Sequence, residues 1–197
     1  MQVTVHNTSC HGCGNRLDIG AKKCEFCDSP VHISTFNSVN DMPMPMVNKY
    51  AASYRAALLQ DPGAGDLYFN MAMCYLKLKL YDKALDAFEN AMANHFDNVE
   101  TYFYAAICLL DGKKAFVAPR ANIDKAKSYL ESALMIESRG IFHYLLAYIK
   151  YDYFERKYLN ISPNWKDCYH EANQAGVSVL DITQLYSILG VSRPDVL

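Results

Sequence analysis

The sequence predicts an all-α solenoid of antiparallel helix pairs, with a small cysteine-rich module in front of it. Three observations support this prediction. Apolar residues recur at helical spacing from Asn48 to the end of the chain. Separate segments of this region match one another at a constant offset of 34 residues. Two Cys-x-x-Cys pairs stand close together near the N-terminus.

Composition narrows the class of protein. Of 197 residues, 51% are hydrophobic and 20% are charged, which excludes a chain that is disordered throughout. A net charge of −2 offers no overall attraction to nucleic acid. We expect no membrane partner, because no apolar run approaches the ~20 residues that span a bilayer. The first ten residues lack a secretory pattern and the seven cysteines are an odd number, so we expect a reducing, cytoplasmic location.

The four paired cysteines, in the stretch CHGCGNRLDIGAKKCEFC (10–27), have the spacing of a metal site. Each Cys-x-x-Cys places two sulfurs on one tight turn, and four thiolates hold a tetrahedral zinc ion with no open coordination position. Gly14 and Asp28 follow the two pairs, where the turn requires a positive φ. We expect one structural zinc, which substitutes for a core that so short a module cannot build. Its ligands are Cys10, Cys13, Cys24 and Cys27.

This stretch resembles the short bacterial zinc ribbon, a family with two Cys-x-x-Cys-Gly turns. The four cysteines match its ligands, and Leu17, Ala21 and Val31 match its small apolar supports. His11 stands where the family commonly has proline, and we expect it to be solvated rather than a ligand. A thioredoxin-type redox motif would need a single pair at a helix start, and rubredoxin-like iron sites have pairs further apart. Structural zinc is therefore the favoured interpretation.

The chain divides into three predicted parts. Residues 1–33 form the zinc ribbon, and residues 48–197 form the helical region. Between them, residues 34–47 (STFNSVNDMPMPMV) are predicted to be an extended linker, because two prolines alternating with methionine oppose a helix.

The repeat is visible when segments are placed one above another. YAASYRAALLQDP (50–62) aligns with ALDAFENAMANHF (84–96), and LYFNMAMCYL (67–76) aligns with TYFYAAICLL (101–110). This period resembles the tetratricopeptide repeat (TPR), a helix–turn–helix unit that stacks into a superhelix. The best copy is 65–98, whose residues at the family's signature positions are Tyr68, Met71, Ala72, Tyr75, Ala84, Phe88 and Ala91.

The other copies are modified. The first keeps only its second helix (about 48–60), and the third has a turn lengthened by about eight residues (111–123). A fourth copy (141–154) precedes a helix that we expect to begin with Ser162 as the cap and Pro163 in the first turn.

A last helix is predicted at residues 178–190. It should begin at Ser178 and end at Gly190, which are good capping residues for the two ends of a helix. We expect this helix to cap the open end of the stack.

In a TPR array the first helix of each unit lines the concave surface, so the resemblance implies a groove there. The groove would be aromatic, with few charges, and would suit a protein or peptide segment held by apolar anchors. A subset of the family clamps the C-terminal carboxylate of heat-shock chaperones, but here Glu100 and Tyr104 replace the clamp cations, which disfavours that partner. The predicted groove residues are Phe69, Asn70, Met73, Lys77, Phe103, Tyr104, Ile107, Tyr144, Leu145 and Tyr148.

We therefore expect a non-catalytic protein–protein interaction adaptor or scaffold and no enzyme. The alternatives are a nucleic-acid-associated regulatory protein that contacts DNA or RNA through the zinc ribbon, an enzyme with its site near Cys74, His143 or His170, and self-association of the solenoid. The loop GKKAFVAPR (112–120) carries three cations; we interpret it as a solvated loop, with an acidic partner as the alternative.

Overall fold

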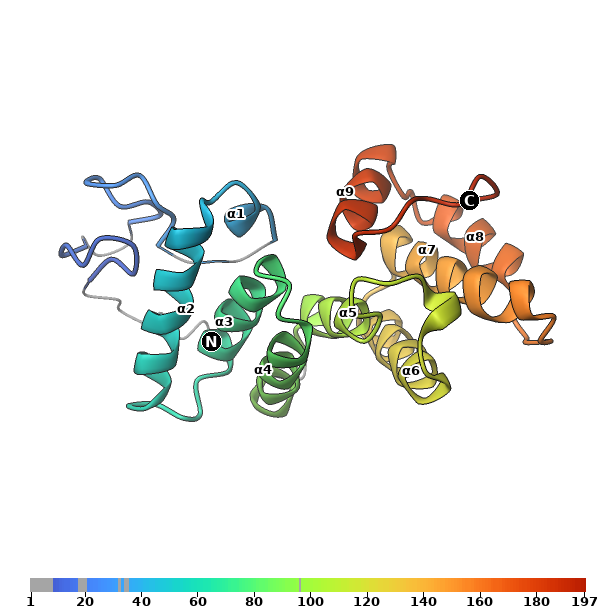
Figure 1. The fold of residues 1–197 in the computed structure, drawn as a ribbon, viewed down its shortest axis with the longest axis horizontal. Coiled ribbons are helices and arrows are strands. Elements are labelled where there is room, and N and C mark those ends of the chain that lie inside the picture. The colour runs from blue at the N-terminus through green and yellow to red at the C-terminus, as the bar shows by residue number, and fades with distance from the viewer. Residues whose placement is uncertain (1–8, 18–20, 32, 34–35, 96) are drawn as a thin grey trace.

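The computed structural model describes residues 9–17, 21–31, 33, 36–95 and 97–197, and within these residues the regular structure is helical (Figure 1). The α-helices that precede the chain's midpoint are α1 (Phe36–Asn40), α2 (Met44–Leu58), α3 (Gly65–Lys77) and α4 (Tyr81–Asn94). Those that follow are α5 (Val99–Cys108), α6 (Arg120–Ile136), α7 (Gly140–Ile149), α8 (Trp165–Gln174) and α9 (Val179–Leu189). Short turns of other helix types are η1 (Ala115–Val117), η2 (Lys150–Phe154) and η3 (Glu155–Lys157).

From α2 to α8, each helix packs against the next one in the sequence. Figure 1 shows this succession along the long axis of the molecule, from α2 in cyan to α8 in orange. A fold in which contacts run between sequence neighbours is what stacked helix pairs require, because no single pair can bury its own apolar face. The prediction of an all-α fold of packed helices is confirmed.

Small residues and one aromatic ring form the centre of the best repeat copy. Ala72, Ala84 and Phe88 are completely buried, and Ala91 is 2% exposed. The ring of Phe88 lies 6.1 Å from that of Tyr104 in a stacked arrangement, while alanines on the facing helices allow this close approach. Five of the seven predicted pattern positions are therefore buried, with Met71 the fifth, while Tyr68 and Tyr75 are partly buried and pack against this core.

The predicted linker is helical over most of its described length. Phe36 to Asn40 form α1, and α2 begins at Met44, four residues earlier than predicted. Pro43 is the N-cap residue and Pro45 lies in the first turn, where a helix needs no N–H donor, so these prolines start the helix instead of preventing it. The prediction of an extended segment over 34–47 is wrong here, and residues 34 and 35 lie outside the described residues.

The long turn of the third copy is confirmed. Eleven residues (109–119) connect α5 to α6, whereas three (78–80) connect α3 to α4. The longer connection contains η1, which packs against η2 at the end of α7. The backbone N–H of Phe116 donates to Oδ2 of Asp152 at 2.8 Å, which ties the connection to the neighbouring unit.

The start of α8 differs from the prediction by two residues. Asn164, not Ser162, is the N-cap, and its side chain accepts hydrogen bonds from the N–H groups of Lys166 and Asp167. The carboxylate of Asp167 accepts the N–H of Asn164 in return, at 2.8 Å. This reciprocal capping box satisfies backbone N–H groups at the start of α8 that have no partner within the helix. A cap at Ser162 followed by Pro163 would satisfy fewer of them, because proline has no N–H.

Helix α9 begins and ends as predicted, but it lies elsewhere. Ser178 forms a capping box at its start, and Gly190 ends it with φ +67°. Its apolar side packs on α7, where Tyr186 contacts Tyr148 with ring centroids 5.6 Å apart. In Figure 1 α9 lies above α7 and not beyond α8. The prediction that it caps the open end of the stack is therefore wrong.

Gly140, the first residue of α7, offers a test of this arrangement. A Cβ at this position would lie 2.6 Å from the backbone N of Val177 and 2.8 Å from O of Ala172. Because both atoms are backbone, we expect Gly140→Ala to lower the free energy of unfolding by about 1–3 kcal/mol. Urea denaturation followed by circular dichroism measures this change.

The matched control is Gly63→Ala, where the nearest atom to an added Cβ is a side-chain oxygen at 3.7 Å. It should change stability by less than about 0.5 kcal/mol. Equal stability of the two variants would contradict the close contact between α7 and the α8–α9 connection.

Candidate functional site

The face that the sequence assigned to a partner is largely covered by the chain itself. Of the ten predicted groove residues, nine are at most 7% exposed: Phe69, Asn70, Met73, Phe103, Tyr104, Ile107, Tyr144, Leu145 and Tyr148. The tenth, Lys77, is half-buried. Its ammonium group donates a hydrogen bond to the backbone O of Asn40, the last residue of α1.

Two segments supply this cover. Phe36 of α1 lies 6.3 Å from Tyr104 between ring centroids. Tyr186 of α9 lies 5.6 Å from Tyr148 and 6.2 Å from Tyr144. The expectation that these side chains are open to a partner is wrong. Removing apolar side chains from water is favourable, and here α1 and α9 of the same chain bury them.

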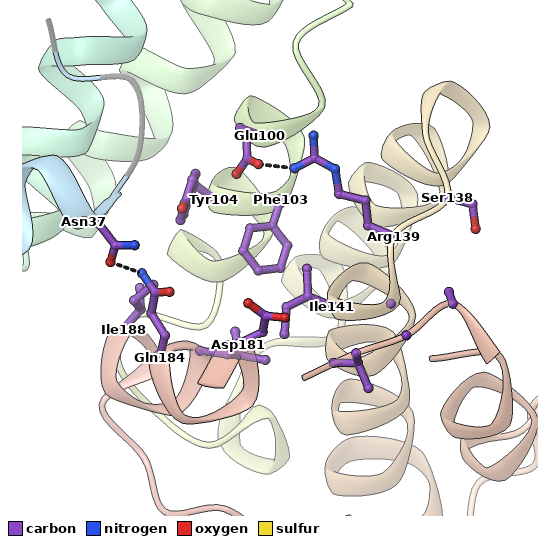
Figure 2. Close-up of a pocket in the computed structure, with 15 residues that line it drawn as sticks. Asn37, Glu100, Phe103, Tyr104, Ser138, Arg139, Ile141, Asp181, Gln184 and Ile188 are labelled. Atoms are coloured by element: carbon purple, nitrogen blue, oxygen red, sulfur yellow. Dashed lines mark hydrogen bonds and ion pairs between the residues drawn. The ribbon is translucent and has the colours of Figure 1, made fainter. Parts of the chain in front are cut away.

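An open cleft remains between the two covering segments (Figure 2). Its volume is about 400 Å³, and α1, α5, the start of α7 and α9 line it. Gln184 of α9 donates from Nε2 to Oδ1 of Asn37 of α1 at 2.6 Å, which closes one side. The cleft combines a mainly apolar floor with polar walls; the floor residues are Phe103, Ile141, Leu185 and Ile188.

Charged side chains stand at the rim of this cleft. Arg139 forms ion pairs with Glu100 and, at 2.7 Å, with Glu137. The pKa of Arg139 is raised, first by its hydrogen bond to Glu137, so the guanidinium is charged at every accessible pH. Asp181 of α9 also lines the cleft, so carboxylates outnumber cations there.

Sequence reasoning identified Phe103 and Tyr104 but missed Arg139, Asp181 and Gln184. The last two belong to a helix that was predicted to cap the stack. Asn37 and Gln184 are separated by 147 residues, and no local pattern predicts a contact over such a distance.

The titratable residues named as enzyme candidates lie in different surroundings. Cys74 is fully buried, and desolvation raises its pKa to about 12, so it is an inert thiol. His170 is exposed and bonds to Gln174. His143 lies between Ser138, whose Oγ is 3.1 Å from Nε2, and Glu171, whose Oε2 is 3.0 Å from Nδ1.

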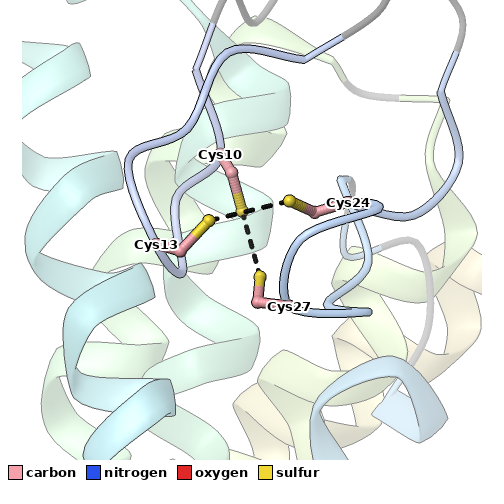
Figure 3. A group of neighbouring side chains, drawn as sticks. All are labelled: Cys10, Cys13, Cys24 and Cys27. Carbon is pink, nitrogen blue, oxygen red and sulfur yellow. Dashed lines mark hydrogen bonds between the residues drawn. The ribbon is translucent and has the colours of Figure 1, made fainter.

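The four paired cysteines converge at one point (Figure 3). Their Sγ atoms all lie within 4.8 Å of one another. The Sγ atoms of Cys10 and Cys27 are 3.7 Å apart, and those of Cys13 and Cys24 are 3.6 Å apart. A tetrahedral site with metal–sulfur bonds of about 2.3 Å has edges of about 3.8 Å. The cluster therefore has the size and donors to hold one metal ion such as zinc.

Two turns of equal backbone structure carry these sulfurs. In the first, Cys10 N donates to Asn15 O and Gly14 N to Cys10 O; in the second, Cys24 N donates to Ser29 O and Asp28 N to Cys24 O. These four hydrogen bonds measure 2.7–2.8 Å. Gly14 has φ +80° and Asp28 has φ +53°, as the sequence predicted. The sequence encodes the same backbone turn twice.

The core of the module is small. It consists of Cys10, Leu17, Cys24 and Val31, with Ala21 and Cys27 partly buried against it. The predicted apolar supports are therefore in place. So little apolar surface cannot stabilise a separate module, and a bound metal would supply the missing free energy.

The module rests on α2. The ring of His11 lies 4.5 Å from that of Tyr54, and its Nδ1 is 2.6 Å from Oγ of Ser53. Tyr50 donates from its hydroxyl to the backbone O of Pro30 at 2.7 Å. His11 is thus not a ligand, and it is packed on α2 and only partly exposed to solvent. The prediction of a solvated histidine is wrong because it did not consider the neighbouring helix.

The thiols differ in acidity. The hydrogen bond with Ser29, at 3.3 Å, lowers the pKa of Cys27 to about 6. A hydrogen bond from the Asn15 backbone lowers the pKa of Cys13, but desolvation and the neighbouring sulfurs raise it to about 12. Four thiolates this close repel one another, so the fully ionised cluster needs a cation.

Comparisons with known proteins identify no relative: no protein-family model matches the chain, and no curated protein matches it. Among the described residues, no helix combines the length and the apolar character needed to cross a bilayer.

The metal site leads to a direct prediction. Purified protein should carry about one metal ion per chain, and Cys24→Ser should lose it, because Cys24 is one of the four converging thiols and is fully buried. Elemental analysis gives the stoichiometry, and Co²⁺ titration gives the absorption of tetrahedral thiolate coordination. Because Cys13 keeps its proton at neutral pH without metal, binding should release protons and weaken as the pH falls.

Cys168→Ser is the matched control, since Cys168 is equally buried but lies in α8. It should keep full metal content. Equal metal content in the two variants would contradict the site.

Proposed function

We propose that this protein is a protein–protein interaction adaptor of the TPR type, in which one structural zinc ion holds the N-terminal module on α2. A short protein segment binds in the cleft between α1, α5, α7 and α9. Zinc is proposed because four thiolates in Cys-x-x-Cys turns suit a tetrahedral, redox-inactive ion and leave no position for substrate. Iron in the elemental analysis would contradict this identity.

The cleft is the observation that carries the proposal. At about 400 Å³ it has the volume of a typical binding pocket, and it lies between elements from both ends of the chain. Phe103 and Ile141 offer an apolar floor, while the amides of Asn37 and Gln184 and the carboxylate of Glu100 offer hydrogen bonds. Such a site suits an extended segment with one apolar anchor side chain, which enters without displacing α1 or α9.

The cleft proposal predicts the effect of filling it. Ala175, an exposed residue that ends α8, lines the cleft, and Ala175→Trp should obstruct it. Peptides selected on the wild-type protein from a random library should lose at least about tenfold in affinity. Fluorescence anisotropy with labelled peptides measures this loss.

Ala93→Trp is the matched control, because Ala93 is an exposed alanine near the end of α4 and does not line the cleft. It should bind the selected peptides normally. If both variants bind them equally well, the cleft is not the binding site.

One arrangement favours a second candidate function, hydrolysis of an acyl ester. Ser138 lines the cleft and its Oγ contacts Nε2 of His143, while a carboxylate oxygen of Glu171 lies 3.0 Å from Nδ1 without the geometry of a hydrogen bond. A serine, a histidine base and an orienting carboxylate are the parts of a nucleophilic site. The start of α7 lacks a side-chain cap, so the N–H groups of Gly140 and Ile141 could face a developing oxyanion.

This alternative is tested with p-nitrophenyl acetate. An esterase site requires the hydrolysis rate to fall at least about a hundredfold in both Ser138→Ala and His143→Gln. Ser128→Ala, an exposed serine of α6, should leave the rate unchanged. A wild-type rate no higher than that of Ser138→Ala would remove this candidate.

A further inference from the structure

We propose that the α5–α6 connection and the end of α7 form a second binding surface, which takes an acidic protein segment. We call this the basic surface. It shares no residue with the cleft, and it goes beyond the proposed function. Its exposed or partly exposed residues are Lys113, Lys114, Phe116, Val117, Arg120, Lys127, Arg156, Lys157 and Tyr158, and the rings of Tyr153 and Phe154 are buried beneath them.

The positive and negative residues are unevenly distributed along the chain, although its net charge is close to zero. Residues 113–166 contain ten lysines and arginines and five acidic residues, a net charge of +5, and six of these ten cations belong to the basic surface. The rest of the chain therefore carries −7. A region of this sign attracts anionic partners over roughly a Debye length, about 8 Å at physiological salt, although the whole protein is weakly acidic.

Aromatic rings hold several of these cations in place. Arg156 and Lys157 lie over Phe116, at 4.6 Å and 5.0 Å from the ring centroid. Arg120 and Lys127 lie over Phe154, at 5.0 Å and 5.2 Å. Cation–π contacts fix the long side chains, so less conformational entropy is lost when a partner binds.

The backbone beneath the basic surface is specialised. The α5–α6 connection is eight residues longer than its counterpart between α3 and α4, and it is anchored by the hydrogen bond from Phe116 N to buried Asp152. Asp152 lies in η2, a π-helical turn that interrupts the regular helix geometry. π-helical turns are rare in proteins, and those that do occur are often found at functional sites. The insertion and the π turn together place cations from three elements side by side.

Three of the cations are available to a partner. Lys113, Arg120 and Arg156 already have carboxylate partners. In the described part of the chain, Lys114, Lys127 and Lys157 have no carboxylate within 4.0 Å. The surface therefore has positive charge that the chain itself does not neutralise.

The partner's class follows from what the rings and the apolar residues offer. Single-stranded nucleic acid is bound by stacking successive bases on several open aromatic faces. Here cations lie over Phe116, Tyr153 and Phe154 are buried, and among the rings of the basic surface only Tyr158 is open. Beside them, Val117 is 63% exposed and Tyr158 is 95% exposed. Free cations next to exposed apolar side chains suit a protein segment that carries carboxylates and at least one apolar residue.

The test uses a fluorescein-labelled peptide of glutamates and aspartates with two leucines and one phenylalanine. Its control replaces the acidic residues by glutamine and asparagine. Anisotropy should show binding of the acidic peptide only, weakened as salt rises. Lys114→Glu/Lys157→Glu should reduce its affinity about tenfold or more.

Lys49→Glu/Lys83→Glu is the matched control, because it changes the net charge equally at exposed lysines elsewhere. It should keep the affinity within about twofold. Lys157→Arg should also keep the affinity, because it keeps the positive charge while changing the packing of the side chain. Thermal melting followed by circular dichroism verifies that each variant is folded. Ala175→Trp should bind the acidic peptide normally, so failure of the cleft leaves this test intact.

Three results would overturn the proposal. Equal losses in the two charge-reversal variants would mean general charge attraction. Equal affinity for the acidic and the amide peptide would remove the charge argument. Tighter binding of a uridine oligonucleotide than of the acidic peptide, lost in Lys114→Glu/Lys157→Glu, would assign the surface to nucleic acid.

Discussion

Burial of the aromatic side chains on α3, α5 and α7 is the constraint on which the rest of this structure depends. These helices pack their small residues against neighbouring helices and leave a row of large rings on one face, among them Tyr104, Tyr144 and Tyr148. Exposing such a row to water would cost about 1.5–3 kcal/mol per ring. The chain therefore covers it with α1 at one end and α9 at the other.

The cysteine-rich module meets the same requirement at the N-terminal end. Tyr50 and Tyr54 of α2 are completely buried, and the ring of His11 and the backbone of Pro30 lie against them. The module has too little core to be stable alone, and α2 has an apolar face that needs cover, since the short helix before it, α1, packs on α3. Each supplies what the other lacks. A metal ion bound to the four thiols would thus stabilise the first helix of the array as well as the module.

The parts of the structure that sequence predicted are those that local patterns encode. The spacing of the four cysteines, the positive φ of Gly14 and Asp28, and the caps Ser178 and Gly190 depend on a few neighbouring residues. The buried alanines follow from a period that repeats along the chain.

The parts that sequence did not predict depend on distant segments. Nothing near residue 184 indicates that Gln184 contacts Asn37, and nothing in the first turn indicates that His11 packs on Tyr54. Pro45 was interpreted as a helix breaker because its place in a first turn is known only once Met44 is seen to begin α2. The net charge of −2 did not indicate the basic surface, because a sum over the chain does not show where the cations lie.

The two proposed binding surfaces are joined by a single continuous helical segment. Gly140 to Lys157 run without a break through α7, η2 and η3. Ile141, at its start, lines the cleft, and Arg156, near its end, belongs to the basic surface. At about 1.5 Å per residue, the two positions are roughly 20 Å apart along one axis. Partners bound at both surfaces would be held apart by one helical segment whose α7 and η2 parts are largely buried, and a flexible linker between two sites does not provide such a defined spacing.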